Sequence, residues 1–113
     1  ITGEKEQVAI EQTIAGMRER LDASQAALLA DATEFRDANT HEVSDFDALK
    51  EGVEAEGGFW VGPWCGDAAC EEKVTAETKA TIRVLPLERE DPGEACVVCG
   101  QAGTERATWA KAY

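Results

Sequence analysis

Four cysteines in two short pairs constrain this chain more than any other feature of its sequence. Cys65 and Cys70 have C-x4-C spacing, Cys96 and Cys99 have C-x2-C spacing, and residues 71–95 separate the two pairs. Each pair can chelate an ion from one turn, and the second pair then completes a tetrahedral set of four thiolates. The sequence therefore predicts a metal centre built from two loops.

Zinc is the first choice for this centre, because a closed site of four sulfurs with no spare ligand is a structural zinc pattern. Iron in a rubredoxin-like site needs the same ligands, so an electron-transfer or thiol-redox module stays open as the alternative. Two disulfides or four free core thiols are the remaining interpretations. Disulfides suit small secreted chains, and no secretory segment is visible here. Gly66 and Gly100 each follow a cysteine, where positive φ would let the chain curl around the metal.

Size and charge limit the functional classes. A chain of 113 residues can bury one modest core, so we expect a single domain. A bound metal would add to the small stability that such a core provides. No apolar run reaches membrane-spanning length, and Ile1 in place of methionine suggests a piece of something longer. With 23 acidic and 11 basic residues the net charge is -12, which repels phosphate backbones. Nucleic-acid binding by this chain alone is therefore not expected.

A long helix is predicted over residues 11–38, where apolar side chains recur at intervals of three, four and seven. The apolar stripe consists of Ile14, Met17, Leu21, Leu28, Ala32 and Phe35. We expect this stripe to form core rather than a partner-binding face, because a small domain has few other residues to cover its sheet.

The rest of the chain alternates between predicted helices and strands. Ser44 or Asp45 can cap a second helix that ends at residues 57–58, and Asp67 can cap a third helix over residues 68–77. The second helix is expected to bury Phe46, Leu49 and Val53. Strands are expected at 7–10, 59–64, 80–87, 96–99 and 104–111, the last two forming a terminal hairpin. This order predicts an α+β, two-layer sandwich, with a small mixed sheet and helices on one face.

Motifs for catalysis are missing from the sequence. It contains no Gly-rich phosphate loop and no Gly-x-Ser-x-Gly motif. His41 is the only histidine, and it could be a base or a fifth metal ligand, but no partner histidine or nucleophile is in view. We expect a solvated or hydrogen-bonded loop histidine, and no catalysis by this chain alone.

Several motifs together resemble a known family, the C-terminal domain of prolyl-tRNA synthetases of the archaeal/eukaryotic type, which some bacteria also have. The resemblance covers nearly the whole chain in order. It rests on residues 35–41 (FRDANTH), 57–59 (GGF), 63–67 (PWCGD), 71–74 (EEKV), 96–100 (CVVCG) and 110–113 (AKAY).

The resemblance implies a fold similar to the C-terminal domain of translation initiation factor three, with one structural zinc on Cys65, Cys70, Cys96 and Cys99. It implies that residues 1–12 are the junction from a preceding anticodon-binding domain and that residues 13–113 form a single zinc-binding domain. ATP and proline would bind only in the catalytic domain of the parent enzyme.

The family also implies partners for the chain. These are the catalytic and anticodon-binding domains of the parent, which would be a cytoplasmic homodimer that holds tRNA through other domains. The carboxylate of the terminal Tyr113 would point towards the catalytic domain and support its active site. A free-standing protein-interaction module is a further, less favoured interpretation.

Overall fold

The computed structural model describes residues 3–89 and 91–112 of the chain. Two compact units are present, Ile1–Ala38 and Asn39–Tyr113. None of the described helices combines the length and the apolar character that a membrane crossing requires.

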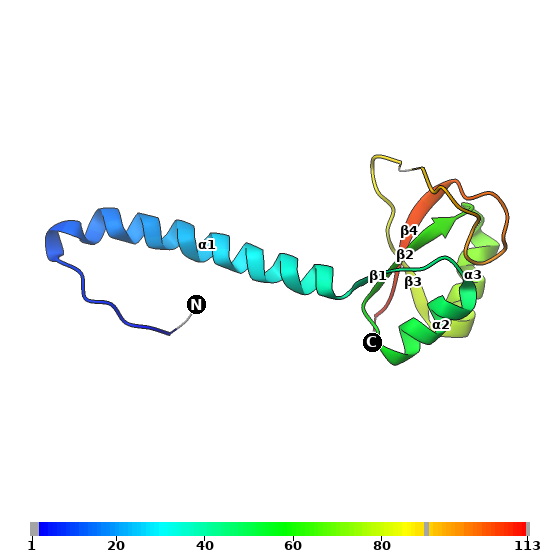
Figure 1. Ribbon diagram of the computed structural model, residues 1–113, viewed down its shortest axis with the longest axis horizontal. Helices are drawn as coiled ribbons and strands as arrows, with labels where there is room; N and C mark the ends of the chain where they lie inside the picture. The colour runs from blue at the N-terminus through cyan, green and yellow to red at the C-terminus, as the bar shows by residue number, and fades with distance from the viewer. Residues whose placement is uncertain (1–2, 90, 113) are drawn as a thin grey trace. The chain divides into compact units, whose positions relative to one another are not determined.

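The first unit is dominated by helix α1 (Thr13–Ala38), which follows a 3-10 turn at Ile10–Gln12 (Figure 1). The helix begins two residues later than the sequence predicts. At its start the Thr13 hydroxyl donates to the carbonyl of Ala9 at 3.2 Å. The strand predicted at residues 7–10 is wrong, because residues 7–9 are irregular and Ile10 already belongs to the turn.

The prediction that the apolar stripe of α1 forms core is also wrong. No residue of α1 is buried, and Ile14 and Phe35 expose 87% and 72% of their surface. The second unit fills its core with its own side chains instead, since three tryptophans supply much of the volume that the stripe was expected to provide.

A four-stranded mixed sheet forms the centre of the second unit, in the order β1-β2-β4-β3 (Figure 1). β1 (Thr40–Glu42) runs parallel to β2 (Phe59–Trp64). β4 (Glu105–Lys111) lies antiparallel between β2 and β3 (Ala80–Val84). The predicted mixed sheet is therefore confirmed.

Two helices, α2 (Phe46–Ala55) and α3 (Ala68–Thr78), lie on the same side of this sheet (Figure 1). They share one core with it, and the ammonium of Lys50 on α2 meets the carboxylate of Glu77 on α3 at 3.3 Å. The two-layer α+β fold with helices on one face is thus confirmed.

Both predicted helix caps are confirmed. The carboxylate of Asp45 accepts from the backbone N–H of Ala48 at 2.8 Å, and that of Asp67 accepts from Ala69 at 2.9 Å. Each satisfies a backbone donor that the first turn of a helix leaves unpaired. Leu49 and Val53 are buried as expected, whereas Phe46 is only partly buried.

The strands of the second unit differ from the predicted ones in three places. The segment 96–99 is a turn and not a strand, so the terminal hairpin does not form and β4 pairs with β2 and β3. β3 ends at Val84, earlier than predicted. β1 was not predicted, because three polar residues carry no clear period and their pairing partner is distant in sequence.

The packing of α2 on the sheet depends on Gly52. A Cβ built at this position would overlap the six-membered ring of the buried Trp60. Trp60 lies opposite Trp109 in the sheet, and its ring stacks on the ring of His41, so the indole has little room to move.

Gly52→Ala should therefore destabilise the protein, although alanine is usually the better helix former. Overpacking costs about 1–3 kcal/mol and the gain in helix propensity is up to about 1 kcal/mol, so a net loss of roughly 1–2 kcal/mol is expected. Urea denaturation followed by tryptophan fluorescence measures it. Glu54→Ala on the exposed side of α2 is the matched control and should change stability little. An unchanged midpoint for Gly52→Ala would contradict the packing described.

Candidate metal centre

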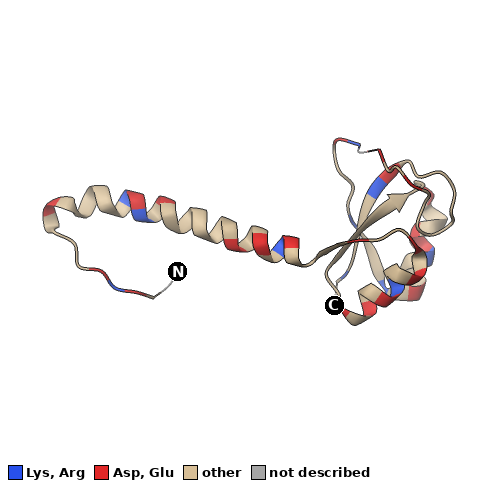
Figure 2. Ribbon diagram, viewed as in Figure 1, with Lys and Arg blue, Asp and Glu red and all other residues tan. Residues whose placement is uncertain are grey.

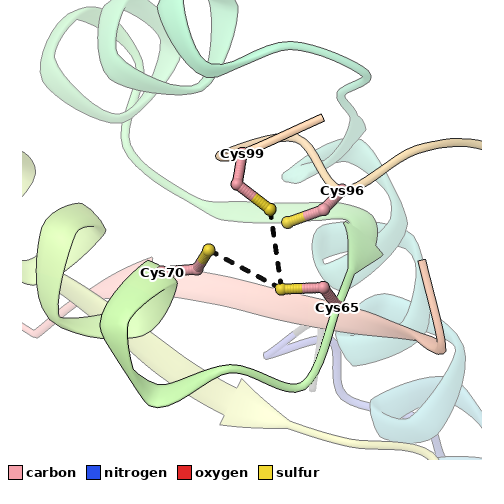
Figure 3. A group of neighbouring side chains, drawn as sticks. All are labelled: Cys65, Cys70, Cys96 and Cys99. Carbon is pink, nitrogen blue, oxygen red and sulfur yellow. Dashed lines mark hydrogen bonds between the residues drawn. The ribbon is translucent and has the colours of Figure 1, made fainter. Parts of the chain in front are cut away.

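The four cysteines come from three places in the second unit and meet at one point (Figure 3). Cys65 directly follows β2, Cys70 lies in the first turn of α3, and Cys96 and Cys99 lie at the two ends of the turn that precedes β4. All four sulfurs are within 4.8 Å of one another.

Two of the separations between the sulfurs are close to those around a tetrahedral ion. Cys65 Sγ lies 3.6 Å from Cys70 Sγ and 3.7 Å from Cys99 Sγ. Zinc–sulfur bonds of about 2.3 Å at tetrahedral angles place sulfurs about 3.8 Å apart, whereas a disulfide needs about 2.05 Å. All four cysteines are free, so the donor set fits a metal and not two disulfides.

The first loop is shaped by Trp64, Gly66 and Asp67. Gly66 has φ of 81°, which only glycine adopts without strain, and this turns the chain back after Cys65. The indole N–H of Trp64 donates to the carbonyl of Asp67 at 3.3 Å, and the N–H of Cys70 donates to the same carbonyl at 3.1 Å. The same loop therefore caps α3 and places Cys70, in the first turn of that helix, next to Cys65.

The second loop is a tight turn anchored to β2. The N–H of Gly100 donates to the carbonyl of Cys96 at 3.0 Å, and Gly100 has φ of 72°. An isolated bridge between Ala95 and Ala102 closes the base of the turn. The N–H of Val97 donates to the carbonyl of Pro63 at 3.0 Å, which ties this turn to the strand that leads into Cys65.

Burial and close spacing oppose the ionisation of two of the thiols. Burial raises the pKa of Cys70, and the neighbouring thiols add to the rise; burial also raises the pKa of Cys65. Burial opposes the ionisation of Cys96 as well, yet the backbone N–H groups of Cys99, Val98 and Cys65 hold the pKa of that thiol below its usual value. Four thiolates at this spacing repel one another, so a bound cation is the natural way to keep them ionised.

The other residues singled out from the sequence lie elsewhere. His41 is in β1, where its ring stacks on Trp60 with centroids 4.5 Å apart and its Nε2 lies 3.6 Å from a carboxylate oxygen of Glu56. It does not belong to the cysteine cluster. Tyr113 lies outside the described residues.

Trp64 was missed as a residue that supports the site, because its indole contact reaches a backbone carbonyl three residues further along the chain. Its position directly before Cys65 was the one available signal.

Comparisons with known proteins identify the family of this chain. The family model described as "Prolyl-tRNA synthetase, C-terminal" matches residues 46–113. A proline–tRNA ligase of Oceanobacillus iheyensis is 42% identical over 112 residues, which are 99% of this chain and 23% of that protein. A proline–tRNA ligase of Alkaliphilus oremlandii is 39% identical over 110 residues, 97% of this chain and 23% of that protein. The chain thus spans about a quarter of the length of these relatives.

Solved structures show the same fold. Prolyl-tRNA synthetase from Cryptosporidium parvum, complexed with L-proline and AMP, superposes with a TM-score of 0.85 at 21% identity, over 97% of this chain and 24% of that one. Giardia lamblia prolyl-tRNA synthetase, in complex with prolyl-adenylate, superposes with a TM-score of 0.72 at 27% identity, over 86% of this chain and 21% of that one. The resemblance drawn from the sequence motifs is confirmed, and the chain belongs to the prolyl-tRNA synthetase C-terminal domain family.

Proposed function

We propose that this chain is a non-catalytic, zinc-stabilised domain that supports the structure and active site of a prolyl-tRNA synthetase, an enzyme that attaches proline to its tRNA using ATP. The observation that supports zinc is the convergence of four free cysteine sulfurs within 4.8 Å of one another, with two of their separations close to the value for a tetrahedral ion. ATP and proline bind in the catalytic domain of the parent. The complex of the Cryptosporidium parvum relative with L-proline and AMP supports such sites in the family.

Zinc, when bound to Cys65, Cys70, Cys96 and Cys99, supplies a closed cross-link with no open position for substrate. One side of the link is the start of α3, held by the cap at Asp67. The other side is a turn in an otherwise irregular connection. The metal therefore acts on stability, because it fixes two loops that short hydrogen-bonded contacts alone would leave weakly held.

Domains of the parent chain are the proposed partners. The apolar stripe of α1 is exposed within this chain, and packing against a catalytic and an anticodon-binding domain would cover it. In this proposal residues 1–12 are the junction from the preceding domain, and residues 13–113 form the zinc-binding domain of a cytoplasmic homodimer. Acidic residues are distributed along α1, α2 and α3 (Figure 2), which supports contact with tRNA through other domains.

Tyr113 is proposed to support the active site of the parent through its terminal carboxylate. A C-terminal carboxylate is a fixed charge at a fixed point of the chain, so it can order groups of a neighbouring domain once the end of the chain is held. The proposal rests on the family resemblance of residues 110–113.

Native mass spectrometry and elemental analysis of the reduced chain should find one zinc per chain. Cys70→Ser should lose the zinc and lower the free energy of unfolding by more than about 4 kcal/mol, as loss of a structural metal does. Urea denaturation with and without a chelator measures the second effect.

Ala69→Ser is the matched control, since it adds a hydroxyl at the exposed neighbouring position and should keep the zinc. Bound iron with visible absorbance would favour electron transfer instead. A metal-free chain of unchanged stability would overturn the structural role of the cluster.

Deletion of Tyr113 in the whole parent enzyme should lower the aminoacylation rate by at least about tenfold, because small misplacements of reacting groups cost up to about 10²-fold. Tyr113→Phe retains the terminal carboxylate and should retain most of the activity. An equal loss of aminoacylation rate in both variants would assign the supporting role to the phenol hydroxyl of Tyr113. An unchanged rate after the deletion would contradict any role of Tyr113 in the active site.

A further inference from the structure

The metal centre is accessible to solvent on one side only. Cys70 and Cys96 expose 7% and 3% of their surface, whereas Cys99 is exposed and Cys65 is half-buried. A small oxidant that approaches from water therefore meets the sulfur of Cys99 first. Cysteine oxidation follows thiolate character and exposure, and a metal-bound cysteine is already a thiolate.

The nearest accessible partner of Cys99 belongs to the other loop. Cys99 Sγ lies 3.7 Å from Cys65 Sγ (Figure 3). Cys96, which shares the short pair with Cys99, exposes only 3% of its surface, so an oxidant or a partner thiol reaches it less easily. Cys65 is half-buried and its sulfur lies within reach, so it is better placed than the buried Cys96 to react with an oxidised Cys99.

We propose that Cys99 and Cys65 form a hydroperoxide-sensitive edge of the metal centre, at which oxidation joins the two loops by a disulfide and releases the metal. The inference rests on the proposed zinc centre and adds to it a site of covalent modification. Spacing along the chain alone would favour a disulfide within the C-x2-C pair instead.

The chemistry balances with a hydroperoxide as the oxidant. The Cys99 thiolate attacks the terminal peroxide oxygen, the O–O bond breaks, and a sulfenic acid forms as hydroxide or alkoxide leaves and takes a proton from water. The Cys65 thiolate then attacks the Cys99 sulfur, the S–S bond forms, and the S–O bond breaks with loss of hydroxide. Two thiolates lose two electrons, and the peroxide is reduced by the same two.

Metal release follows from the change in the donor set. Two anionic ligands become neutral disulfide sulfurs, so Cys70 and Cys96 alone remain to bind the ion. The new bond connects the loop after β2 with the turn before β4, the two segments that the metal had joined. We therefore expect the oxidised chain to stay folded without its metal.

The test uses the zinc-loaded chain, whose metal content is measured first, so that failure of the zinc proposal is seen before any oxidant is added. Hydrogen peroxide is then added below one equivalent. A chromogenic chelator reports the zinc released, and peptide mass spectrometry after thiol alkylation maps the disulfides. A Cys65–Cys99 linkage that appears together with zinc release is expected. An earlier Cys96–Cys99 or Cys65–Cys70 linkage, or oxidation with the zinc retained, would overturn the proposal.

Cys99→Ser provides a second readout, because a hydroxyl cannot be oxidised in this way. Loaded with zinc, this variant should release the metal at least about tenfold more slowly, since its accessible thiolate is gone. If Cys99→Ser fails to hold zinc, the disulfides mapped in the unaltered chain still test the proposal, because they show whether Cys65 and Cys99 are joined first. Reduction with dithiothreitol in the presence of zinc should restore the metal content, and far-UV circular dichroism should change little throughout.

Discussion

The approach of four cysteine sulfurs at the end of β2 is the constraint on which much of the second unit depends. Between β3 and β4 the described residues form no helix or strand longer than an isolated bridge. An irregular connection of this length is unusual in a small domain unless something holds it. Here the turn at 96–99 is held by the cysteine cluster and by the hydrogen bond from Val97 to Pro63.

The hydrophobic core and the cysteine cluster meet on the same strand. Trp60 and Trp64 project from β2 into the core, and Cys65 follows at once. Cys70 and Cys96 are themselves buried members of that core. Removal of the metal would therefore loosen the packing around Cys70 and Cys96 as well as the loops. The contact between Gly52 on α2 and Trp60 on β2 would remain. Substitutions at the cysteines therefore test metal binding, whereas a substitution at Gly52 tests the packing of α2 on the sheet.

Local signals in the sequence predicted a large part of this structure. The caps at Asp45 and Asp67, the strand at 59–64 and the four-cysteine spacing were all readable, because each depends on neighbours a few residues apart. The failures involve distant partners. The β-branched Val97 and Val98 favour a strand, yet the segment forms a turn, which is closed by the N–H of Gly100 on the carbonyl of Cys96 and tied to β2 by the N–H of Val97. The periodicity of α1 correctly predicted a helix with an apolar face. Periodicity alone cannot say whether residues of the same chain cover that face.

Zinc K-edge X-ray absorption of the purified chain tests the central claim most directly. The account predicts a single shell of four sulfurs at about 2.3 Å with no nitrogen or oxygen ligand. A shell with fewer than four sulfurs, or with light-atom ligands in their place, would contradict a closed centre built from Cys65, Cys70, Cys96 and Cys99.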